Sequence, residues 1–226
     1  MPAQITLYDL ERSRSQRIGW LLEELKVDYN VETFKRNERQ RADPALFKIH
    51  PLGKAPVISV DGKIIAESAV IIDYLIKNFG QGSELEAKNE EEAFDINYYL
   101  HHSEATLQPC LLLLFVTDVT NKQAPYLLKS VAKKVTEAQD DGYALPELKL
   151  NLKYLDDKLK TNGTGFFVGD HLSGADIIYS FPLLDAKHRK FATAEDYPHI
   201  FKWIDLITAR PAYKAALEKT GKPAKI

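Results

Sequence analysis

The pattern of apolar and polar positions divides the chain into two parts. In the first part, an apolar run at 5–8 predicts a short strand, and apolar residues spaced three and four apart predict an amphipathic helix over 15–25. Alternation at 29–33 predicts a second strand, and residues 44–49 carry the pattern of a weak helical turn. Strands and helices that alternate in this way predict a sheet with helices packed on its faces.

A hairpin is predicted directly after the helical turn. Its strands are the apolar run at 57–60 and the pair at 64–65, which flank the dipeptide Asp61-Gly62. This dipeptide is typical of a type I′ turn, because both central positions of that turn take positive φ. We therefore expect two antiparallel strands joined by a tight turn.

The segments on either side of the hairpin also carry structural signals. A proline lacks an N–H, so Pro56 is tolerated at the first residue of the strand, where a cis bond after Ala55 would turn the chain. Beyond the hairpin, a helix is predicted over 68–79. The side chains expected on its buried face are Val70, Ile71, Tyr74 and Leu75. The resulting order, βαβαββα, makes residues 1–80 one α/β domain with a mixed sheet.

The second part of the chain predicts helices alone. Residues 81–92, which begin glycine-rich and continue with an acidic run, are expected to be a linker, and residues 93–226 an all-helical domain. Helical spacing is present over 94–116, with a bend or break near Pro109, and over 124–140, 145–160, 176–184, 198–209 and 211–217. The polar residues 139–142 are expected to stop the second of these helices.

The clearest helix start in the chain lies at Ser173. Its hydroxyl can accept from the N–H of Asp176 while the Asp176 carboxylate reaches back, which is a capping box with Asp in place of Glu. Leu172 and Ile177 occupy the flanking apolar positions. Such a cap typically contributes about 1 kcal/mol.

Composition and charge exclude several classes of function. Thirty basic and thirty-two acidic residues give a formal charge of −2, which provides no electrostatic basis for binding nucleic acid or an anionic membrane. Cys110 is the only cysteine, which excludes an intrachain disulfide, a CxxC pair and a multi-cysteine metal site. The longest apolar run, 110–116, is too short to span a bilayer, and no signal-peptide pattern begins the chain. We expect a cytoplasmic protein, and the six histidines show no metal-binding motif.

Two serines lie where the first strand turns into the first helix. Ser13 and Ser15 are placed beside the unpaired N–H groups of a helix start, which favour an anion. Two interpretations stay open from the residues alone: one serine is the helix N-cap among solvated arginines, or the turn holds an anionic ligand. A serine hydrolase is not indicated, because the chain has no GxSxG motif.

Several segments, in order and spacing, carry a family resemblance over nearly the whole chain. They are Ser13-Arg14-Ser15-Gln16-Arg17-Ile18-Gly19-Trp20-Leu21-Leu22-Glu23-Glu24-Leu25, His50-Pro51-Leu52-Gly53-Lys54-Ala55-Pro56, Glu67-Ser68-Ala69-Val70-Ile71-Ile72-Asp73-Tyr74-Leu75, and Gly169-Asp170 with the capping box at 173–176. With these segments the sequence resembles the cytosolic glutathione transferases, most closely the fungal and bacterial branches that use a serine.

The resemblance implies a thioredoxin-like N-terminal domain that holds glutathione and an all-helical C-terminal domain that completes the electrophile pocket. It implies these glutathione-binding residues: Lys54 for the glycyl carboxylate, the backbone of Ala55 before a cis Pro56 for the cysteinyl part, Glu67 and Ser68 for the γ-glutamyl part, and a further His or Arg from 36–41. Ser13 would donate a hydrogen bond to the sulfur. Ser15 is the alternative donor, and Tyr8 in the first strand is the candidate if the protein uses a tyrosine.

The implied activity is conjugation of the glutathione thiolate to electrophiles, with glutathione-dependent peroxidase activity in addition, in detoxification and oxidative stress. The alternatives are a glutathione-dependent disulfide reductase and a non-enzymatic glutathione-transferase-like interaction module. Glutathione would be a co-substrate, with no metal. The family also implies a homodimer, formed through the helix that begins at Ser68 and the helix that begins at Phe94.

Overall fold

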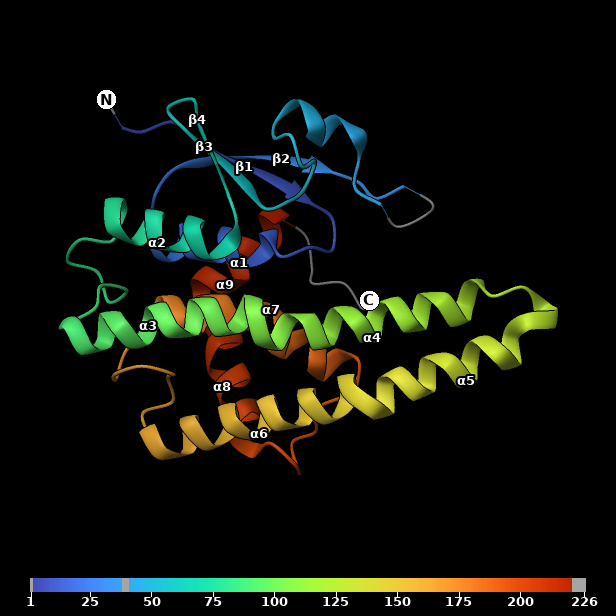
Figure 1. Ribbon diagram of the computed structural model, residues 1–226. Helices are drawn as coiled ribbons and strands as arrows, with labels where there is room; N and C mark the ends of the chain where they lie inside the picture. The colour runs from blue at the N-terminus through green and yellow to red at the C-terminus, as the bar shows by residue number, and fades with distance from the viewer. Residues whose placement is uncertain (1, 38–40, 221–226) are drawn as a thin grey trace.

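The computed structural model describes residues 2–37 and 41–220. A sheet forms one layer, two helices lie against it, and further helices form the rest of the molecule (Figure 1). The strands are β1 (Ile5–Leu10), β2 (Tyr29–Phe34), β3 (Val57–Val60) and β4 (Lys63–Ala66), in the spatial order β2-β1-β3-β4. Because β1 pairs parallel with β2 and antiparallel with β3, the sheet is mixed, as the sequence predicted.

The hairpin between β3 and β4 is confirmed. Its turn residues, Asp61 and Gly62, have φ values of +49° and +83°, the positive pair that a type I′ turn needs. Val60 pairs with Lys63 on either side of the turn, so β4 begins one residue before Ile64, where the second strand was expected to begin.

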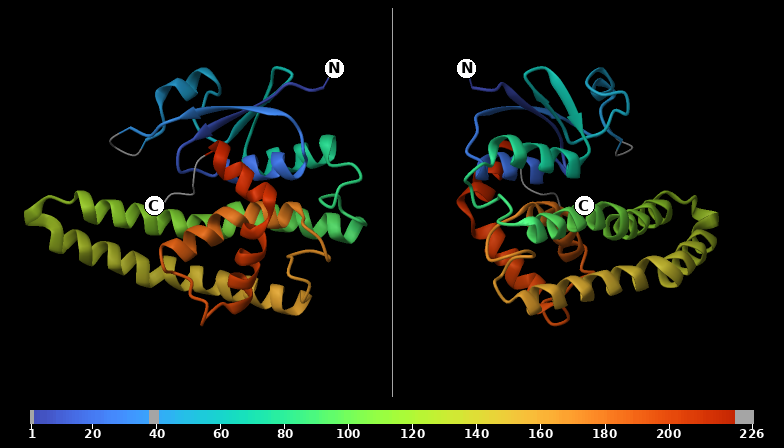
Figure 2. Two further views of the ribbon diagram at one scale, coloured as in Figure 1. Left: turned by 180° about the vertical axis from the view of Figure 1, so that it is seen from behind. Right: turned by 60° about the vertical axis from the view of Figure 1, so that its left-hand side comes forward.

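Two helices lie between the sheet and the helical domain, α1 (Ser15–Glu24) and α2 (Ser68–Phe79) (Figures 1 and 2). The expected helical turn is a 3₁₀ turn, Pro44–Lys48. The prediction for the buried face of α2 is wrong at Val70, whose side chain is 54% exposed, and it omitted Ile72, which is buried. Residues two apart on a helix point in nearly opposite directions, so burial of Ile72 leaves Val70 in solvent.

The regular elements described after α2 are all helical. They are α3 (Glu90–His102), α4 (Gln108–Gln123), α5 (Lys129–Gln139), α6 (Leu145–Asn162), α7 (Gly174–His188), α8 (Pro198–Ala209) and α9 (Pro211–Thr220), with short turns between some of them. The molecule is therefore a thioredoxin-like domain with a four-stranded sheet followed by an all-helical domain. Residues 90–92 of the expected linker belong to α3.

Two π-helical turns join helices end to end. Ser103–Leu107 lies between α3 and α4, so the irregularity expected near Pro109 is a π-helical turn that ends two residues before the proline, and the chain stays helical through it. Asp140–Ala144 carries α5 directly into α6, and the expected polar stop at 139–142 is wrong. The Asp140 carboxylate accepts a hydrogen bond from the Thr117 hydroxyl of α4 (2.8 Å), so this polar stretch is used in packing.

Helices α4 and α5 form an arm that projects from the body of the molecule (Figure 1). α4 continues to Gln123, past the predicted end at 116, and a 3₁₀ turn, Tyr126–Leu128, precedes α5. The helix predicted over 124–140 therefore starts only at Lys129.

The capping box at the start of α7 is confirmed. The Ser173 N–H donates to the Asp176 carboxylate (3.0 Å), and the reciprocal bond is also present. The same carboxylate accepts from the indole N–H of Trp203 (2.8 Å) and from the N–H of Phe167 (3.2 Å). Burial raises the pKa of Asp176 to about 6. α7 extends beyond the predicted 176–184 at both ends and is the centre of the helical domain's core. None of the helices in the described part of the chain is both long and apolar enough to cross a membrane.

Candidate active site

The turn between β1 and α1 places the two candidate serines in contact. Their hydroxyl oxygens lie 2.7 Å apart, and the Ser15 N–H donates to the Ser13 hydroxyl (3.1 Å). Ser15 is fully buried and its oxygen accepts the N–H of Leu10 (3.3 Å), whereas Ser13 is partly exposed. The N-cap residue of α1 is Arg14, without a side-chain cap, so neither serine is the helix N-cap.

A buried carboxylate adjoins this turn. Asp9, near the end of β1, is 2% exposed, and its Oδ2 has no hydrogen-bond partner among the described residues. Burial raises the pKa of this carboxyl to about 6, while hydrogen bonds from the Ser15 and Thr33 hydroxyls act in the opposite direction. The sequence interpretation omitted Asp9. The feature of the sequence that could have indicated it is a single acidic residue within an apolar strand.

Tyr8, the tyrosine alternative, lies one residue earlier on β1. Its ring packs beside the Phe34 ring with centroids 6.5 Å apart, at the edge of a small buried cluster of Leu10, Phe34 and Leu46. This packing gives Tyr8 a structural role in the domain.

The segment before β3 has the backbone shape that the resemblance implied. The Ala55-Pro56 bond is cis, Pro56 is buried, and Ala55 is half-buried ahead of the first paired residue. Lys54 is exposed. Gly53 has a φ of +55°, and a Cβ there would lie 2.8 Å from the Phe47 ring, so this turn requires glycine.

Glu67 and Ser68 lie at the start of α2. Glu67 is the N-cap residue with a φ of +71° and an exposed side chain, while Ser68 is buried as the first helical residue. The Glu67 side chain makes no cap hydrogen bond. The first N–H groups of a helix lack partners inside the helix and attract a carboxylate, so this end of α2 is suited to an anionic group.

The sheet register brings these segments to one end of the domain. Val57 at the start of β3 pairs with Tyr8 near the end of β1 and with Ala66 at the end of β4. The serine turn follows β1, Ala55-Pro56 precedes β3, and Glu67-Ser68 follows β4, so the three segments extend from the same end of the sheet. This end combines the hydroxyl groups of the serine turn, the backbone before a cis proline and a helix N-terminus.

An ionic cluster joins the serine turn to the helical domain. The Glu104 carboxylate, in the π-helical turn after α3, binds the Arg14 guanidinium (2.7 Å) and the Arg17 guanidinium. Arg17 is fully buried, donates to the Ile178 carbonyl (2.7 Å), and has its pKa lowered to about 10 by burial. Sequence reasoning missed this cluster. The feature of the sequence that could have indicated it is Arg17, which lies next to the apolar face of the first helix.

Two further predictions concern ligand groups. Arg36, from the segment expected to supply a carboxylate-binding side chain, donates to the backbone carbonyls of Glu11 (3.1 Å) and Arg12 (3.2 Å). Residues 38–40 of that segment lie outside the described residues. Within the described part of the chain, no group of three or more His, Cys, Asp or Glu side chains could hold a metal ion.

The fold belongs to the class with a thioredoxin-like domain followed by an all-helical domain. Family models described as "Glutathione S-transferase, N-terminal domain" and "Glutathione S-transferase, C-terminal domain" match residues 3–77 and 117–220. The chain is 38% identical over 222 residues to glutathione S-transferase 1 of Saccharomyces cerevisiae, a match that covers 95% of this chain and 94% of that protein. The chain belongs to the glutathione S-transferase family of enzymes.

Solved structures agree with this assignment. A glutathione S-transferase from Actinobacillus pleuropneumoniae is 30% identical, with a TM-score of 0.78 and coverage of 98% of this chain and 95% of that one. A sphingomonad glutathione S-transferase complexed with glutathione has the same fold at 20% identity, with a TM-score of 0.73 and coverage of 96% and 98%.

Proposed function

We propose that the protein conjugates the thiol of glutathione to small electrophiles, with Ser13 as the hydrogen-bond donor to the sulfur. In this step the thiolate sulfur forms a bond to an electrophilic carbon, and the leaving group departs with its electron pair. The observation that carries the proposal is the sheet register, in which the serine turn, Ala55-Pro56 and Glu67-Ser68 extend from one end of the sheet.

The glutathione contacts are proposed from the same geometry. The backbone of Ala55 would pair with the cysteinyl part of glutathione as an added strand does at a sheet edge. Glu67 and Ser68, at the start of α2, would hold the γ-glutamyl amine and carboxylate, and the exposed Lys54 would hold the glycyl carboxylate. The structural neighbour solved with glutathione supports this choice of ligand.

Burial distinguishes the two serines. Ser15 is fully buried and its oxygen is occupied by the Leu10 N–H and by Ser13, which leaves it poorly placed to reach a ligand. Ser13 is partly exposed, and the Ser15 N–H fixes its oxygen. A thiol has a pKa near 8.5, and a donor that stabilises the anion lowers this pKa by about one unit for each 1.4 kcal/mol.

The experiment that tests this function measures turnover of 1-chloro-2,4-dinitrobenzene and retention on immobilised glutathione for the wild type, Ser13→Ala, Ser15→Ala and Tyr8→Phe. Ser130→Ala, at an exposed position on α5, is the matched control. We expect loss of turnover in Ser13→Ala alone, with retention unchanged. Turnover in Ser13→Ala equal to wild type would move the role to another group, and no retention of the wild type would refute glutathione as co-substrate.

Assays of the same variants with other substrates distinguish the other candidate activities. Turnover of cumene hydroperoxide would add peroxidase activity, whereas activity on a glutathione mixed disulfide without conjugation would favour the disulfide reductase. Binding with none of these reactions would favour a non-enzymatic interaction module. Cytoplasmic location and a role in detoxification and oxidative stress stay predictions, tested by a fluorescent fusion and by the sensitivity of a deletion strain to electrophiles and peroxides.

We also propose that two copies associate through α2 and α3. Three large apolar side chains on these helices are exposed, namely Val70, Phe94 and Tyr98, and a partner would cover them. Light scattering should give the mass of a dimer for the wild type and of a monomer for Val70→Asp/Phe94→Asp. A dimer that persists in the double variant would contradict this interface.

A further inference from the structure

Three side chains connect the serine turn to the interior of the sheet domain. The hydroxyl oxygens of Ser13 and Ser15 lie 2.7 Å apart, and the Ser15 hydroxyl is also hydrogen-bonded to the Asp9 carboxyl. Exposure falls along this chain of groups, because Ser13 is partly exposed, Ser15 is fully buried and Asp9 is 2% exposed. The chain therefore joins a hydroxyl that a ligand can reach to an acid beneath the surface.

Backbone bonds leave each serine hydroxyl with the groups that a proton relay needs. The Ser13 oxygen accepts the Ser15 N–H (3.1 Å), and the Ser15 oxygen accepts the Leu10 N–H (3.3 Å). A hydroxyl has one proton and two acceptor sites. Each serine therefore keeps one proton and one acceptor site, so it can accept from one neighbour in the chain and donate to the other.

Such a chain has two directions. When Asp9 is ionised, Ser15 donates to the carboxylate and Ser13 donates to Ser15, so the Ser13 oxygen can accept from a thiol. When Asp9 is protonated, the carboxyl donates to Ser15 and Ser15 donates to Ser13, so Ser13 donates to a thiolate instead. The protonation of Asp9 therefore decides whether Ser13 can donate to a sulfur atom.

The surroundings of Asp9 suit a carboxyl that gains and loses a proton. Its Oδ2 has no hydrogen-bond partner among the described residues, and a buried charge without a partner is costly, so an added proton relieves this cost. The groups that act on it are the hydroxyls of Ser15 on α1 and Thr33 on β2 and the carboxylate of Glu11 in the turn. None of these three groups is positively charged. Burial raises the pKa of Asp9 to about 6.

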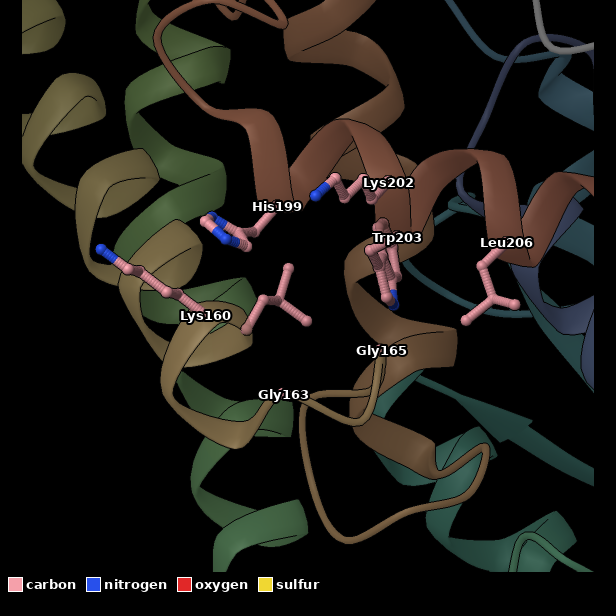
Figure 3. Close-up of a pocket in the computed structure, with 8 residues that line it drawn as sticks. Lys160, Gly163, Gly165, His199, Lys202, Trp203 and Leu206 are labelled. Carbon is pink, nitrogen blue, oxygen red and sulfur yellow. The ribbon is translucent and has the colours of Figure 1, made fainter.

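Histidine is the usual proton acceptor near neutral pH, but three of the histidines are held in the helical domain. Each of the three is bonded to a partner there: His102 to Tyr179 (2.8 Å), His171 to Glu92 (3.2 Å) and His199 to Asp156 (3.0 Å). Figure 3 shows His199 in a pocket between the end of α6 and α8, and none of the described residues 9–15 lines this pocket. Asp9, in contrast, contacts the serine turn directly through Ser15.

We propose that Asp9 takes up the proton of the glutathione thiol through Ser13 and Ser15, an inference that rests on the proposed function. The S–H bond breaks and its electron pair stays on sulfur. The thiol proton passes to the Ser13 oxygen, the Ser13 proton to the Ser15 oxygen, and the Ser15 proton to the Asp9 carboxylate. The negative charge moves from the buried carboxylate to the thiolate, and no proton leaves to water. After conjugation the thioether carries no charge on sulfur, and Asp9 gives its proton to water as the product leaves.

The test counts the protons released when glutathione binds at pH 7.5, where Asp9 is ionised beforehand. The count comes from binding heats in buffers of different ionisation enthalpy, with binding of S-methylglutathione, which has no thiol, subtracted. A bound thiol with a pKa of about 6.5, against about 8.5 in water, releases about 0.8 proton per site if no internal acceptor takes it. The wild type should release less than about 0.3 proton and still show thiolate absorbance near 240 nm.

Two variants break the chain of groups at different links, so either one alone tests it. Asp9→Asn removes the acceptor and Ser15→Ala removes the middle hydroxyl, and each should release about 0.8 proton. Turnover at pH 7.5 should be retained in both, because water accepts the proton in place of Asp9. Asp157→Asn, at an exposed position on α6, is the matched control and should release as little as the wild type.

The proton count separates the relay from a merely structural role of Asp9, which would change affinity or stability but not the count. Release of about 0.8 proton by the wild type, together with thiolate absorbance, would overturn the relay and leave the proposed function standing. Release below about 0.3 proton by both chain variants, with thiolate absorbance present, would also overturn it. Absence of thiolate absorbance in the wild type would refute the proposed function, and the relay with it.

Discussion

Removal of the Ser13 hydroxyl is the perturbation that bears most directly on the chemistry. The Ser13 oxygen accepts the Ser15 N–H (3.1 Å) and lies 2.7 Å from the Ser15 hydroxyl oxygen. A bound thiolate would take the Ser13 hydroxyl as a hydrogen-bond donor in place of this contact with Ser15. A hydrogen bond to a charged group contributes about 1.5–3 kcal/mol. Dividing by 1.36 kcal/mol per unit gives a rise of about 1–2 units in the pKa of the bound thiol for Ser13→Ala.

The assay is the pH dependence of kcat/KM for 1-chloro-2,4-dinitrobenzene. Ser13→Ala should lose about 5- to 50-fold at pH 6.5, where a wild-type bound thiol with a pKa of about 6.5 is half ionised, and should approach the wild type above pH 9, where the thiol ionises unaided. Ser13→Thr retains the hydroxyl and should keep most of the wild-type profile. Ser15→Ala, which loses a buried acceptor of the Leu10 N–H (3.3 Å), should change stability more than the profile.

A profile for Ser13→Ala that is lowered equally at all pH values would refute this reasoning. It would mean that the hydroxyl positions the substrate without stabilising the thiolate. An unchanged profile would place the donor elsewhere.

Three other variants test the buried charges. The pKa of Asp9 is about 6 in the folded protein against an ordinary 3.8, so the folded state holds this proton more tightly and the wild type loses stability as the pH rises from about 4 to 6. Asp9→Asn does not titrate, so its advantage in free energy of unfolding over the wild type should be larger at pH 7.5 than at pH 4, by up to about 3 kcal/mol. An advantage of the same size at both pH values would contradict this prediction. Glu104→Gln leaves the Arg17 charge buried and should lose about 3 kcal/mol in urea unfolding, whereas a loss below 1 kcal/mol would show that the charge is solvated. Asp176→Ala leaves the Trp203 indole N–H without its acceptor and should lose about 3–5 kcal/mol, and a melting temperature within two degrees of wild type would argue against it.

The features that the sequence predicted correctly are set by neighbours in the chain. The Asp61-Gly62 turn and the Ser173–Asp176 capping box each depend on residues within four positions, and both are present. The irregularity expected near Pro109 is also present, as a π-helical turn at Ser103–Leu107.

The features that it did not predict depend on packing between distant segments. The polar residues after α5 do not stop the helical chain, which continues from Asp140 as a π-helical turn. The Asp140 carboxylate binds Thr117 on a neighbouring helix. Val70 is exposed because the phase of α2 is set by what the helix packs against. The pairing of Arg17 with Glu104 joins residues 87 positions apart, and no local pattern indicates it.

The candidate site also combines features that the local sequence indicates with features that depend on packing between distant segments. The residue types at Ser13, Ala55-Pro56 and Glu67-Ser68 were evident from the sequence, but their convergence depends on the register that pairs Val57 with Tyr8 and Ala66. Asp9 was missed because an acid inside an apolar strand carries no sign of its partner until the turn is built over it.

The central claim is that this site binds glutathione and stabilises its thiolate. Titration of the thiolate absorbance near 240 nm, on the complex of the protein with glutathione, measures this directly. The account predicts a pKa for the bound thiol of about 6.5, roughly two units below the ordinary value of 8.5. A bound thiol that titrates at its ordinary value, or an absence of binding, would contradict it.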